Sequence, residues 1–447
     1  MSELPPGPSG LPLVGSTVSF VRDPFSTYER WASEYGDVVA ADIAGQTFVM
    51  VAHPDQIERV LVTDQEYYGK GSFQRDQLGD IVGDGLLLSE GEAWREQRDR
   101  LQPSFFRERL QQYATTMVEE TRARTEDWGS GDTVVLNDEL QNLTLAIMAR
   151  TLFGFDIEDA DGQFADTART ISERFNLSHV STYLPPWIPT PRNRRYRSAL
   201  KNLDTVIYDV IDSRRAEMRE AEEEDSQEDL LSVLLAASDD PETDLTDETL
   251  RDEIATVILG GHDTAALAMT YTLIALSRHP AAEEKVREEL DAVLGDEDPT
   301  VPDLPALSRL DAAVKEAMRL YPPAYTLFRE PNQQVEIDGY DVPKGAILTI
   351  PQWVVHRDER WFDAPEEFRP DRWSDEFEES LPEYAYFPFG GGKRHCIGMR
   401  YGLMETKLVV ATLLQRFEFD FQLPELSFSA ALTLQPAEPL SMEVEKV

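Results

Sequence analysis

The chain has 447 residues, 41% of them hydrophobic, and its 84 acidic residues outnumber its 42 basic ones to give a formal charge of -42. This excess of negative charge disfavours binding to nucleic acid or to an anionic membrane, because both are polyanions. Dissolved salt screens the self-repulsion of such a surface. We therefore expect a well-solvated acidic protein suited to the salt-rich cytoplasm of a salt-adapted organism.

One compact domain over residues 1–447 is favoured, since neither an internal repeat nor a Gly/Ser-rich linker interrupts the hydrophobic pattern. The single cysteine cannot form an internal disulfide, so nothing indicates secretion. The N-terminus lacks a basic region followed by an apolar one, and no apolar run of about 18 residues occurs. A soluble, cytoplasmic protein without a membrane anchor is expected.

The first part of the chain combines extended segments with helices. The N-terminal 20 residues are rich in Pro and Gly and are predicted to form an extended cover. Alternating apolar residues predict a β-hairpin with strands at 38–43 and 47–51. The stretch 67–89 mixes glycine with apolar side chains without a sustained period, so we expect a long, apolar-lined loop there.

Residues 94–109 form a basic island in this acidic protein, because they include five arginines and three acids. Apolar residues recur every three to four positions over about 108–127 and 137–153, which predicts amphipathic core helices. Prolines and aromatic residues break this pattern at 183–189. The acidic run 222–225 is predicted to be a solvated loop.

A very long helix is predicted next. Thr246 is a candidate N-cap, and Asp247 and Glu248 follow it in the first turn, where acids stabilise the helix dipole. The helical pattern runs to about Arg278, far beyond the 11 or 12 residues of an average helix. Such a helix is expected to cross the whole domain.

Two adjacent glycines, Gly260 and Gly261, lie inside this helix, where each costs about 1 kcal/mol relative to alanine. Close packing against another backbone is one explanation. The other is a local opening of the helix, with Asp263 and Thr264 beside it as an acid and an alcohol that relay protons.

The remaining elements are shorter. A helix over about 307–321 is stopped by Pro322 and Pro323. Short strands are predicted at 335–337, 346–350 and 417–421, and beyond residue 430. The expected fold class is therefore mainly α with small peripheral β-sheets.

Cys396 lies in a glycine-rich loop that leads into a helical pattern, Phe389-Gly390-Gly391-Gly392-Lys393-Arg394-His395-Cys396-Ile397-Gly398. A buried free cysteine is often only a small hydrophobe, but a position near a helix N-terminus favours the thiolate. The six histidines show no paired ligand spacing, so a zinc site is not supported. The loop also lacks the pattern of a phosphate loop. A single thiolate is, however, the axial ligand that haem iron uses for O–O cleavage.

This loop resembles, position for position, the haem-binding loop F-G-x-G-x-R-x-C-x-G of the cytochrome P-450 family of haem-thiolate monooxygenases. Three further motifs resemble those of the family and occur in the family's order along essentially the whole chain. They are Gly260-Gly261-His262-Asp263-Thr264 for A/G-G-x-D/E-T, Glu316-Ala317-Met318-Arg319 with Arg372 for the E-x-x-R triad, and Trp94 with Arg98 for W-x-x-x-R.

The resemblance implies a cytochrome P-450 fold, in which a long central helix crosses beneath the haem-facing pocket, and haem b (iron protoporphyrin IX) as cofactor. Cys396 would be the iron ligand, and Asp263 and Thr264 would be the catalytic residues that bring protons to dioxygen. The triad would be buried and structural. The other haem-binding residues would be Trp94, Arg98, Arg329, Arg394, Phe389, Gly390, Gly398 and Gly261.

The implied activity is insertion of one oxygen atom from O2 into a lipophilic organic substrate, such as a fatty acid or terpenoid. Because no flavin or nicotinamide domain follows residue 447, electrons are expected from a separate partner, an acidic ferredoxin. It would dock near Arg95, Arg98, Arg100, Arg107, Arg109 and Lys393. The substrate loops would carry Phe73, Leu78, Leu87, Leu184, Trp187, Tyr325 and Leu432.

Two alternatives remain open. Within the haem-thiolate enzymes, the protein could be a peroxide-driven peroxygenase or an isomerase, although the pair Asp263 and Thr264 favours activation of O2. From a different class, it could be a non-enzymatic haem sensor or electron carrier.

Overall fold

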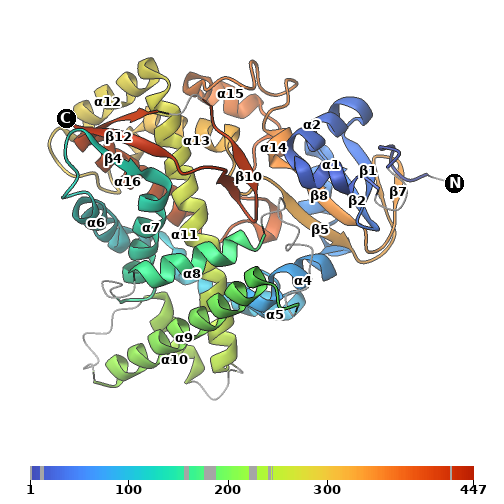
Figure 1. Cartoon of the computed structure of the whole chain (residues 1–447), viewed down its shortest axis with the longest axis horizontal. Helices are drawn as coiled ribbons and strands as arrows, with labels where there is room; N and C mark the ends of the chain where they lie inside the picture. Colours follow the sequence, from blue (N-terminus) through green and yellow to red (C-terminus); the bar gives the residue numbers. More distant parts are fainter. Residues whose placement is uncertain are drawn as a thin grey trace.

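The computed structural model describes residues 3–10, 15–155, 161–175, 188–220, 229–239, 243, 245–422 and 425–447. Helices make up most of it, and small sheets lie at its edges (Figure 1). The α-helices are α1 Thr17–Arg22, α2 Pro24–Tyr35, α3 Pro54–Glu58, α4 Gly71–Val82, α5 Gly91–Leu101, α6 Arg107–Arg124, α7 Leu136–Leu152, α8 Asp161–Glu173, α9 Pro191–Glu220, α10 Leu230–Ser238, α11 Asp247–Ser277, α12 Pro280–Leu294, α13 Ser308–Leu320, α14 Gln352–Val355, α15 Asp375–Ser380 and α16 Met399–Arg416.

The strands form four sheets, the largest of which has the order β1-β2-β8-β5-β3. Within this sheet β2 and β8 are parallel, with Phe48 opposite Ile347, and the other pairs are antiparallel. The strands are β1 Val38–Ile43, β2 Gln46–Val51, β3 Tyr68–Gly69, β4 Asp132–Val135, β5 Leu327–Pro331, β6 Val335–Ile337, β7 Tyr340–Val342, β8 Ile347–Ile350, β9 Phe417–Phe421, β10 Phe428–Ala430, β11 Leu434–Pro436 and β12 Ser441–Lys446.

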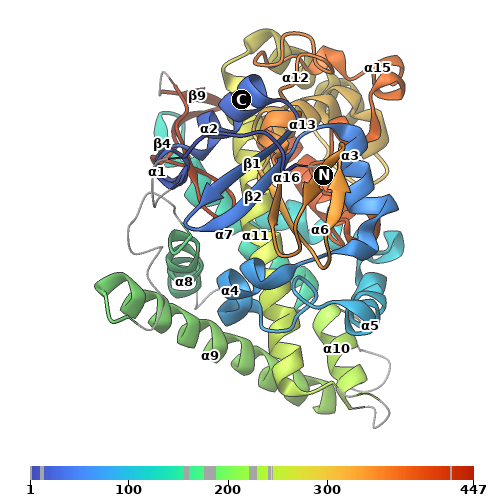
Figure 2. The same ribbon diagram turned by 90° about the vertical axis from the view of Figure 1, so that its right-hand side faces the viewer.

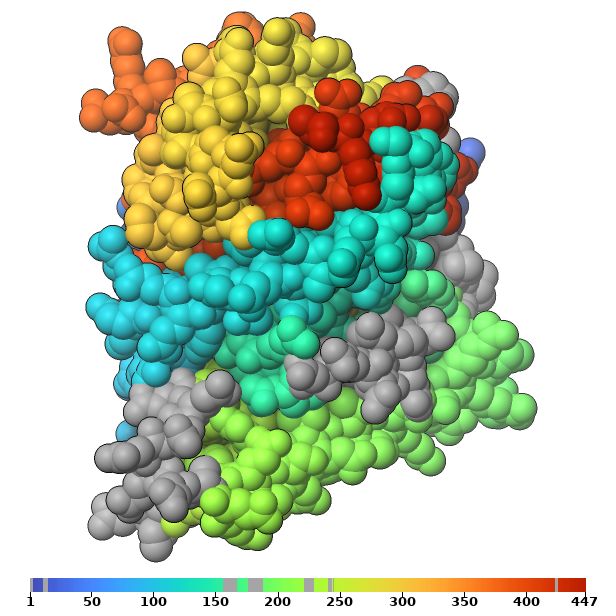
Figure 3. Space-filling model, turned by 90° about the vertical axis from the view of Figure 1, so that its left-hand side faces the viewer, coloured from blue at the N-terminus to red at the C-terminus, as the bar shows by residue number. Residues whose placement is uncertain are grey.

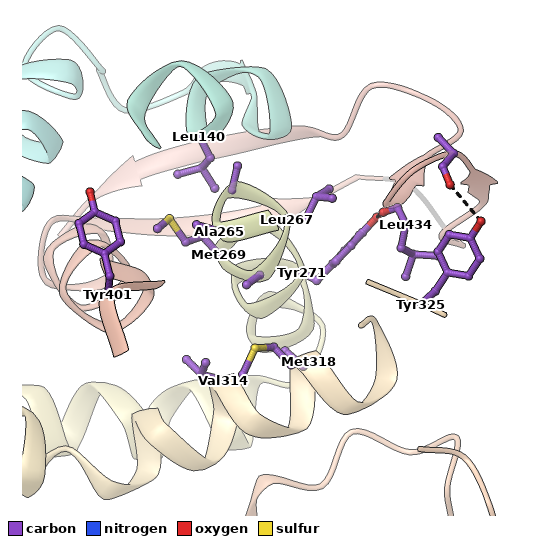
Figure 4. Close-up of a cluster of buried hydrophobic side chains, with 14 of the residues drawn as sticks. Leu140, Ala265, Leu267, Met269, Tyr271, Val314, Met318, Tyr325, Tyr401 and Leu434 are labelled. Carbon is purple, nitrogen blue, oxygen red and sulfur yellow. Dashed lines mark hydrogen bonds between the residues drawn. The ribbon is translucent and has the colours of Figure 1, made fainter. Parts of the chain in front are cut away.

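The long helix α11 is the centre of the molecule and runs through it from end to end (Figures 1 and 2). Its N-terminus is as predicted, because the Thr246 hydroxyl accepts a hydrogen bond from the backbone N–H of Thr249. Its second half is buried on all sides. Figure 4 shows its side chains Ala265, Leu267, Met269 and Tyr271 packed among residues of α7, α13 and α16.

Helices cover α11 on the outer faces of the molecule. In Figure 3, α6 (cyan) forms a band between α12 (yellow) above it and the α9 and α10 region (green) below it. The predicted helices at 108–127 and 137–153 are confirmed as α6 and α7, and the helix at 307–321 is confirmed as α13. None of the helices in the described ranges is both long and apolar enough to span a bilayer.

The hairpin at 38–51 and the strands at 335–337, 346–350 and 417–421 are also confirmed. The predicted loop over 67–89 is wrong, because α4 occupies most of it. Leu78, Ile81 and Val82 are spaced three and four apart and all three are buried, so packing stabilises a helix that its glycines weaken.

The N-terminal cover is confirmed only in part. Ala40 donates to the carbonyl of Pro6, which ties the extended residues 3–10 to β1. The helix α1 already begins at Thr17, inside the stretch that we expected to be extended. The acidic run 222–225 lies outside the described residues, as does all of 183–189 except its last two residues.

Candidate active site

The loop that carries Cys396 is held tightly by its neighbours just before α16. The Cys396 N–H donates to the carbonyl of Phe389 across the loop at 2.9 Å. Gly392 has a left-handed φ of 64°, and a Cβ there would lie 2.0 Å from the carbonyl oxygen of Leu61. A Cβ on Gly391 would lie 2.3 Å from the ring of Tyr384. Only glycine fits at these two positions.

The Cys396 side chain has accessible surface, yet protein surrounds the sulfur so densely that burial is the main influence on its ionisation. Burial raises the pKa of the Cys396 thiol, while the N–H of Gly398 and the charge of Arg98 act in the opposite direction. The N–H of Gly398, at the N-cap of α16, thus acts in the direction that we expected, but burial outweighs it. A metal ion at the sulfur would reverse this balance, since coordination deprotonates a thiol.

Three predicted haem contacts, Trp94, Arg98 and Arg394, come together beside this loop. Arg98, on α5, donates through Nη1 to the carbonyl of His395 at 2.8 Å, and its Nη2 lies 3.2 Å from Nε2 of that histidine. The guanidinium of Arg394 lies over the Trp94 ring, 4.8 Å from its centroid, and donates to the carbonyl of Ser89.

Arg329, the fourth predicted donor, lies on β5 and is 8% exposed. Burial and the charge of Arg394 lower the pKa of Arg329 to about 10. Lys70 belongs to the same cluster, because burial and the charges of Arg329 and Arg394 hold its pKa well below its ordinary value. Glu90 is the acid that opposes these shifts at all three residues.

Converging, partly desolvated cations that repel one another need an anionic partner. Within the described residues, no salt bridge pairs Lys70, Arg98, Arg329 or Arg394 with a carboxylate. Haem carries two propionate carboxylates, and it is also the group that a single cysteine thiolate ligates. The donor set, the close-packed loop and the lone sulfur therefore fit haem.

The glycine pair lies in the middle of α11. The helix is continuous through Gly260 and Gly261, so the predicted local opening is absent. A Cβ on Gly261 would lie 3.2 Å from the sulfur of Met148, whereas one on Gly260 would meet no atom within 4 Å. Close packing against Met148 therefore explains the glycine at position 261, whereas Gly260 faces open space. Thr264 is one turn further on and donates to the Gly260 carbonyl at 2.7 Å.

Asp263 is 4% exposed and its carboxylate points to a different part of the protein from the Thr264 hydroxyl. Oδ1 accepts from Gln141 of α7 at 2.9 Å. Oδ2 accepts from the Thr433 hydroxyl at 2.5 Å and from Nε2 of Gln435 at 2.7 Å. The structure therefore separates the predicted acid and alcohol, although they are adjacent in sequence.

The predicted triad is buried. Glu316 and Arg319 are 0% exposed and share two hydrogen bonds of 2.9 Å, and Arg372 donates to the same carboxylate at 2.9 Å. Trp373 adds a fourth donor at 2.9 Å. Arg319 also donates to the backbone carbonyls of His356, Pro365 and Glu367, so it ties three chain segments together.

The triad supports the cysteine loop through His356. Burial and the charges of Arg319 and Arg357 hold the pKa of His356 well below its ordinary value, so the ring is neutral. A neutral imidazole has a free acceptor nitrogen, and Nε2 of His356 accepts the backbone N–H of Phe387 at 3.0 Å. Gln352 donates to the carbonyl of the same residue at 2.9 Å. These two hydrogen bonds hold in place the segment that leads into the cysteine loop.

Sequence reasoning missed several residues of this site. His395 occupies an unspecified position of the loop pattern and pairs with Arg98. Lys70 is one of only eight lysines in the chain, which is the only signal that could have singled it out. Gln141, Thr433 and Gln435 are ordinary polar residues that only the fold brings to Asp263.

Comparison with known proteins agrees with this geometry. Residues 5–443 match the family model described as cytochrome P-450. Pentalenene oxygenase of Streptomyces avermitilis is 32% identical over 92% of this chain and 90% of its own. Cyclooctat-9-en-7-ol 5-monooxygenase of Streptomyces melanosporofaciens is 30% identical over 92% of this chain and 88% of its own. The solved structure of retinoic acid bound cyanobacterial CYP120A1 superposes with a TM-score of 0.87 at 25% identity and covers 100% of both chains.

Proposed function

The chain belongs to the cytochrome P-450 family of monooxygenases, which are oxidoreductases, and we propose that it inserts one oxygen atom from O2 into a lipophilic organic substrate. The reaction balances as RH + O2 + 2 electrons + 2 protons giving ROH + H2O. The second oxygen atom leaves as water, and a separate redox partner supplies the electrons.

Haem b is the proposed cofactor and supplies the oxidising chemistry when it is bound. The residues of this chain provide position and charge. Cys396 would ligate the iron, Lys70, Arg98, Arg329 and Arg394 would hold the propionates, and the neighbouring loop glycines would allow close approach of the macrocycle.

The helix α11 carries the two residues that would deliver protons. The Thr264 hydroxyl lies on the same side of the helix as the open space at Gly260. It could accept a hydrogen bond there, or donate one after it turns away from the Gly260 carbonyl. Asp263, the preceding residue, would return a proton to that hydroxyl. The observation that carries the proposal is the convergence of partly desolvated cations on a loop with one cysteine, which fits haem. The acid and alcohol on α11 favour an oxygenase over a sensor or electron carrier, which needs neither.

Aromatic and aliphatic side chains support a lipophilic substrate. Phe73 of α4 packs on Phe48 and Phe328, with ring centroids 5.7 and 5.3 Å apart. Leu78 of α4 is also buried, and Leu432 is half-buried on the C-terminal hairpin. The names of the two relatives above refer to an alkene and an unsaturated alcohol, which supports a terpenoid rather than a fatty acid here. Leu184 and Trp187 lie outside the described residues.

The proposed reaction can be tested with isotopically labelled dioxygen. The haem-loaded protein, a surrogate ferredoxin with its reductase, and a panel of terpenes and fatty acids are incubated under 18O2. We expect one 18O atom per product molecule in mass spectra. Label from H2O2 instead of O2, with no turnover on reductant and O2, would establish a peroxygenase and contradict the proposal.

The partner is proposed to be an acidic ferredoxin that docks beside the cysteine loop. Arg95, Arg107, Lys393 and Arg400 are exposed, in a protein whose formal net charge is -42. The segments that carry these four residues contact one another. Arg98 of α5 donates a hydrogen bond to His395 of the cysteine loop, and the ring of Phe105 lies 6.3 Å from that of Tyr401 on α16, measured between centroids. Arg98 itself is buried, so it is not part of the docking surface that we expected.

Charge reversal tests this surface. Because complementary charges steer association, Arg95→Glu with Arg107→Glu is expected to slow ferredoxin binding about tenfold at low salt. The difference should vanish near 1 M salt, where the screening length is about 3 Å. Stopped-flow reduction of the haem measures the rate. Arg22→Glu, an exposed arginine on α1, is the control, and equal rates for the two variants would exclude this face.

The large excess of acid also supports the proposal that the enzyme works in a salt-rich cytoplasm, as a salt-adapted protein would.

A further inference from the structure

Asp263 is a buried carboxylate whose hydrogen-bond donors are all uncharged side chains. Its three hydrogen-bond donors are Gln141, Thr433 and Gln435. No lysine or arginine of the described residues forms a salt bridge with it. Buried carboxylates usually have a cationic partner, so this one depends on its three neutral donors to stay in place.

The donors form a closed arrangement. The Nε2 group of Gln435 donates to Oδ2 of Asp263 at 2.7 Å and to the Thr433 hydroxyl at 2.7 Å. The Thr433 hydroxyl in turn donates to Oδ2 at 2.5 Å. Gln141 holds the other carboxylate oxygen from α7. Both oxygens are thus engaged from two separate elements.

Thr433 and Gln435 belong to the C-terminal hairpin of β10 and β11, which is tied down on both sides of Thr433. The hydroxyl of Tyr325 donates to the carbonyl of Ala431 at 3.0 Å, and that of Tyr271 donates to the carbonyl of Leu434 at 2.6 Å. Figure 4 shows Tyr271 and Tyr325 near Leu434. The hairpin therefore presents its two donors to Asp263 from a fixed position.

Successive side chains on an α-helix point about 100° apart. With its carboxylate bonded to the hairpin, Asp263 faces away from the direction of the Thr264 hydroxyl, which bonds to Gly260. The acid has to leave Thr433 and Gln435 before an oxygen of it can reach the hydroxyl side of the helix.

We propose that Gln141, Thr433 and Gln435 are positioning residues that latch Asp263 and so control how often it delivers a proton toward Thr264. This inference rests on the proposed function, because it assigns Asp263 to the relay. One latched and one released rotamer of Asp263 would alternate, and the two protons consumed per O2 would pass only through the released one.

The test uses the haem-loaded full chain and needs no redox partner. The protein is reduced with dithionite, freed of excess reductant and mixed with O2-saturated buffer, and its reoxidation is followed in H2O and D2O. Each reduced haem gives one electron to O2, which leaves with one proton as HO2, so the reoxidation rate reports the delivery of that proton. Thr433→Val and Gln435→Leu each remove one neutral hydrogen bond, which is expected to raise the released population and the reoxidation rate about fivefold. Thr433→Ser keeps the hydroxyl and should behave as wild type.

Gln422→Leu is the matched control, since Gln422 also donates to a carboxylate, that of Asp420, but at the surface. Asp263→Asn should slow reoxidation and abolish the gain from Thr433→Val. Latch variants that reoxidise at the wild-type rate with an unchanged solvent isotope effect would overturn the proposal, as would an Asp263→Asn protein with wild-type kinetics.

A second readout is independent of haem. In thermal unfolding of the haem-free protein, Gln435→Leu should lower the melting temperature of wild type more than that of Asp263→Asn, because the contact is already weakened there. If Gln435→Leu lowered the melting temperature equally in wild type and in Asp263→Asn, the hydrogen bond between Gln435 and Asp263 would not contribute to stability. Failure of the proposed function looks different, because the wild type would then incorporate no 18O while the latch variants still changed reoxidation.

Discussion

Cys396→Ser is expected to abolish the red-shifted absorption that thiolate-ligated haem gives in its reduced, carbon monoxide-bound form. Cys396 is the only cysteine in the chain, and a serine hydroxyl does not ionise to replace a thiolate as an electron-donating axial ligand. Turnover with O2 should fall to background. The measurement is the difference spectrum of the reduced protein with and without carbon monoxide.

Ile397→Val is the control, because it trims one methylene beside the cysteine and leaves the sulfur in place. It should keep the full thiolate-type band. A Cys396→Ser protein that retains this band, or a wild type with a histidine-type haem spectrum, would contradict the assignment of the iron ligand.

Arg319→Met is expected to destabilise the folded protein strongly. It removes one of the two arginine partners of the fully buried Glu316 and leaves the carbonyls of His356, Pro365 and Glu367 without their donor. Breaking one side of a buried ion pair costs about 3–5 kcal/mol. That is a large share of the roughly 5–15 kcal/mol that stabilises a typical domain.

Urea unfolding of the haem-free protein measures this loss. Arg309→Met on the same helix removes an exposed arginine and serves as the control, with an expected change within about 0.5 kcal/mol. If the two variants unfolded at the same urea concentration, Arg319 would not hold the three segments together. We also expect weaker haem retention in Arg319→Met, because His356 then loses its tie to the triad.

The sequence was sufficient to predict elements whose signals are local. The helix α11 begins with an N-cap threonine and two acids and has a long apolar pattern, so both its start and its length were predictable. The hairpin at 38–51 follows from alternation around a short turn. α4 was missed because its stability comes from contacts of Leu78, Ile81 and Val82 with the rest of the protein, which no local pattern records.

The residues of the site also fall into those that a local pattern predicts and those that only the fold brings together. Residues with a fixed spacing, such as Glu316 with Arg319 or Trp94 with Arg98, could be predicted because one helix places them on one face. Lys70 and Gln435 could not, because each reaches the site from a distant part of the chain. Asp263 shows a further limit, since its place in a motif was predictable but the direction of its carboxylate depends on the C-terminal hairpin.

The parallel pairing of β2 with β8 has a consequence for how the chain folds. Phe48 is placed opposite Ile347, and Gly392 packs against the backbone of Leu61. Closing such long loops is entropically costly and makes folding slow. As the chain leaves the ribosome, the hairpin of β1 and β2 keeps an open strand edge until almost 350 residues have been made. The cysteine loop is completed later still, so haem can be captured only by a nearly finished chain.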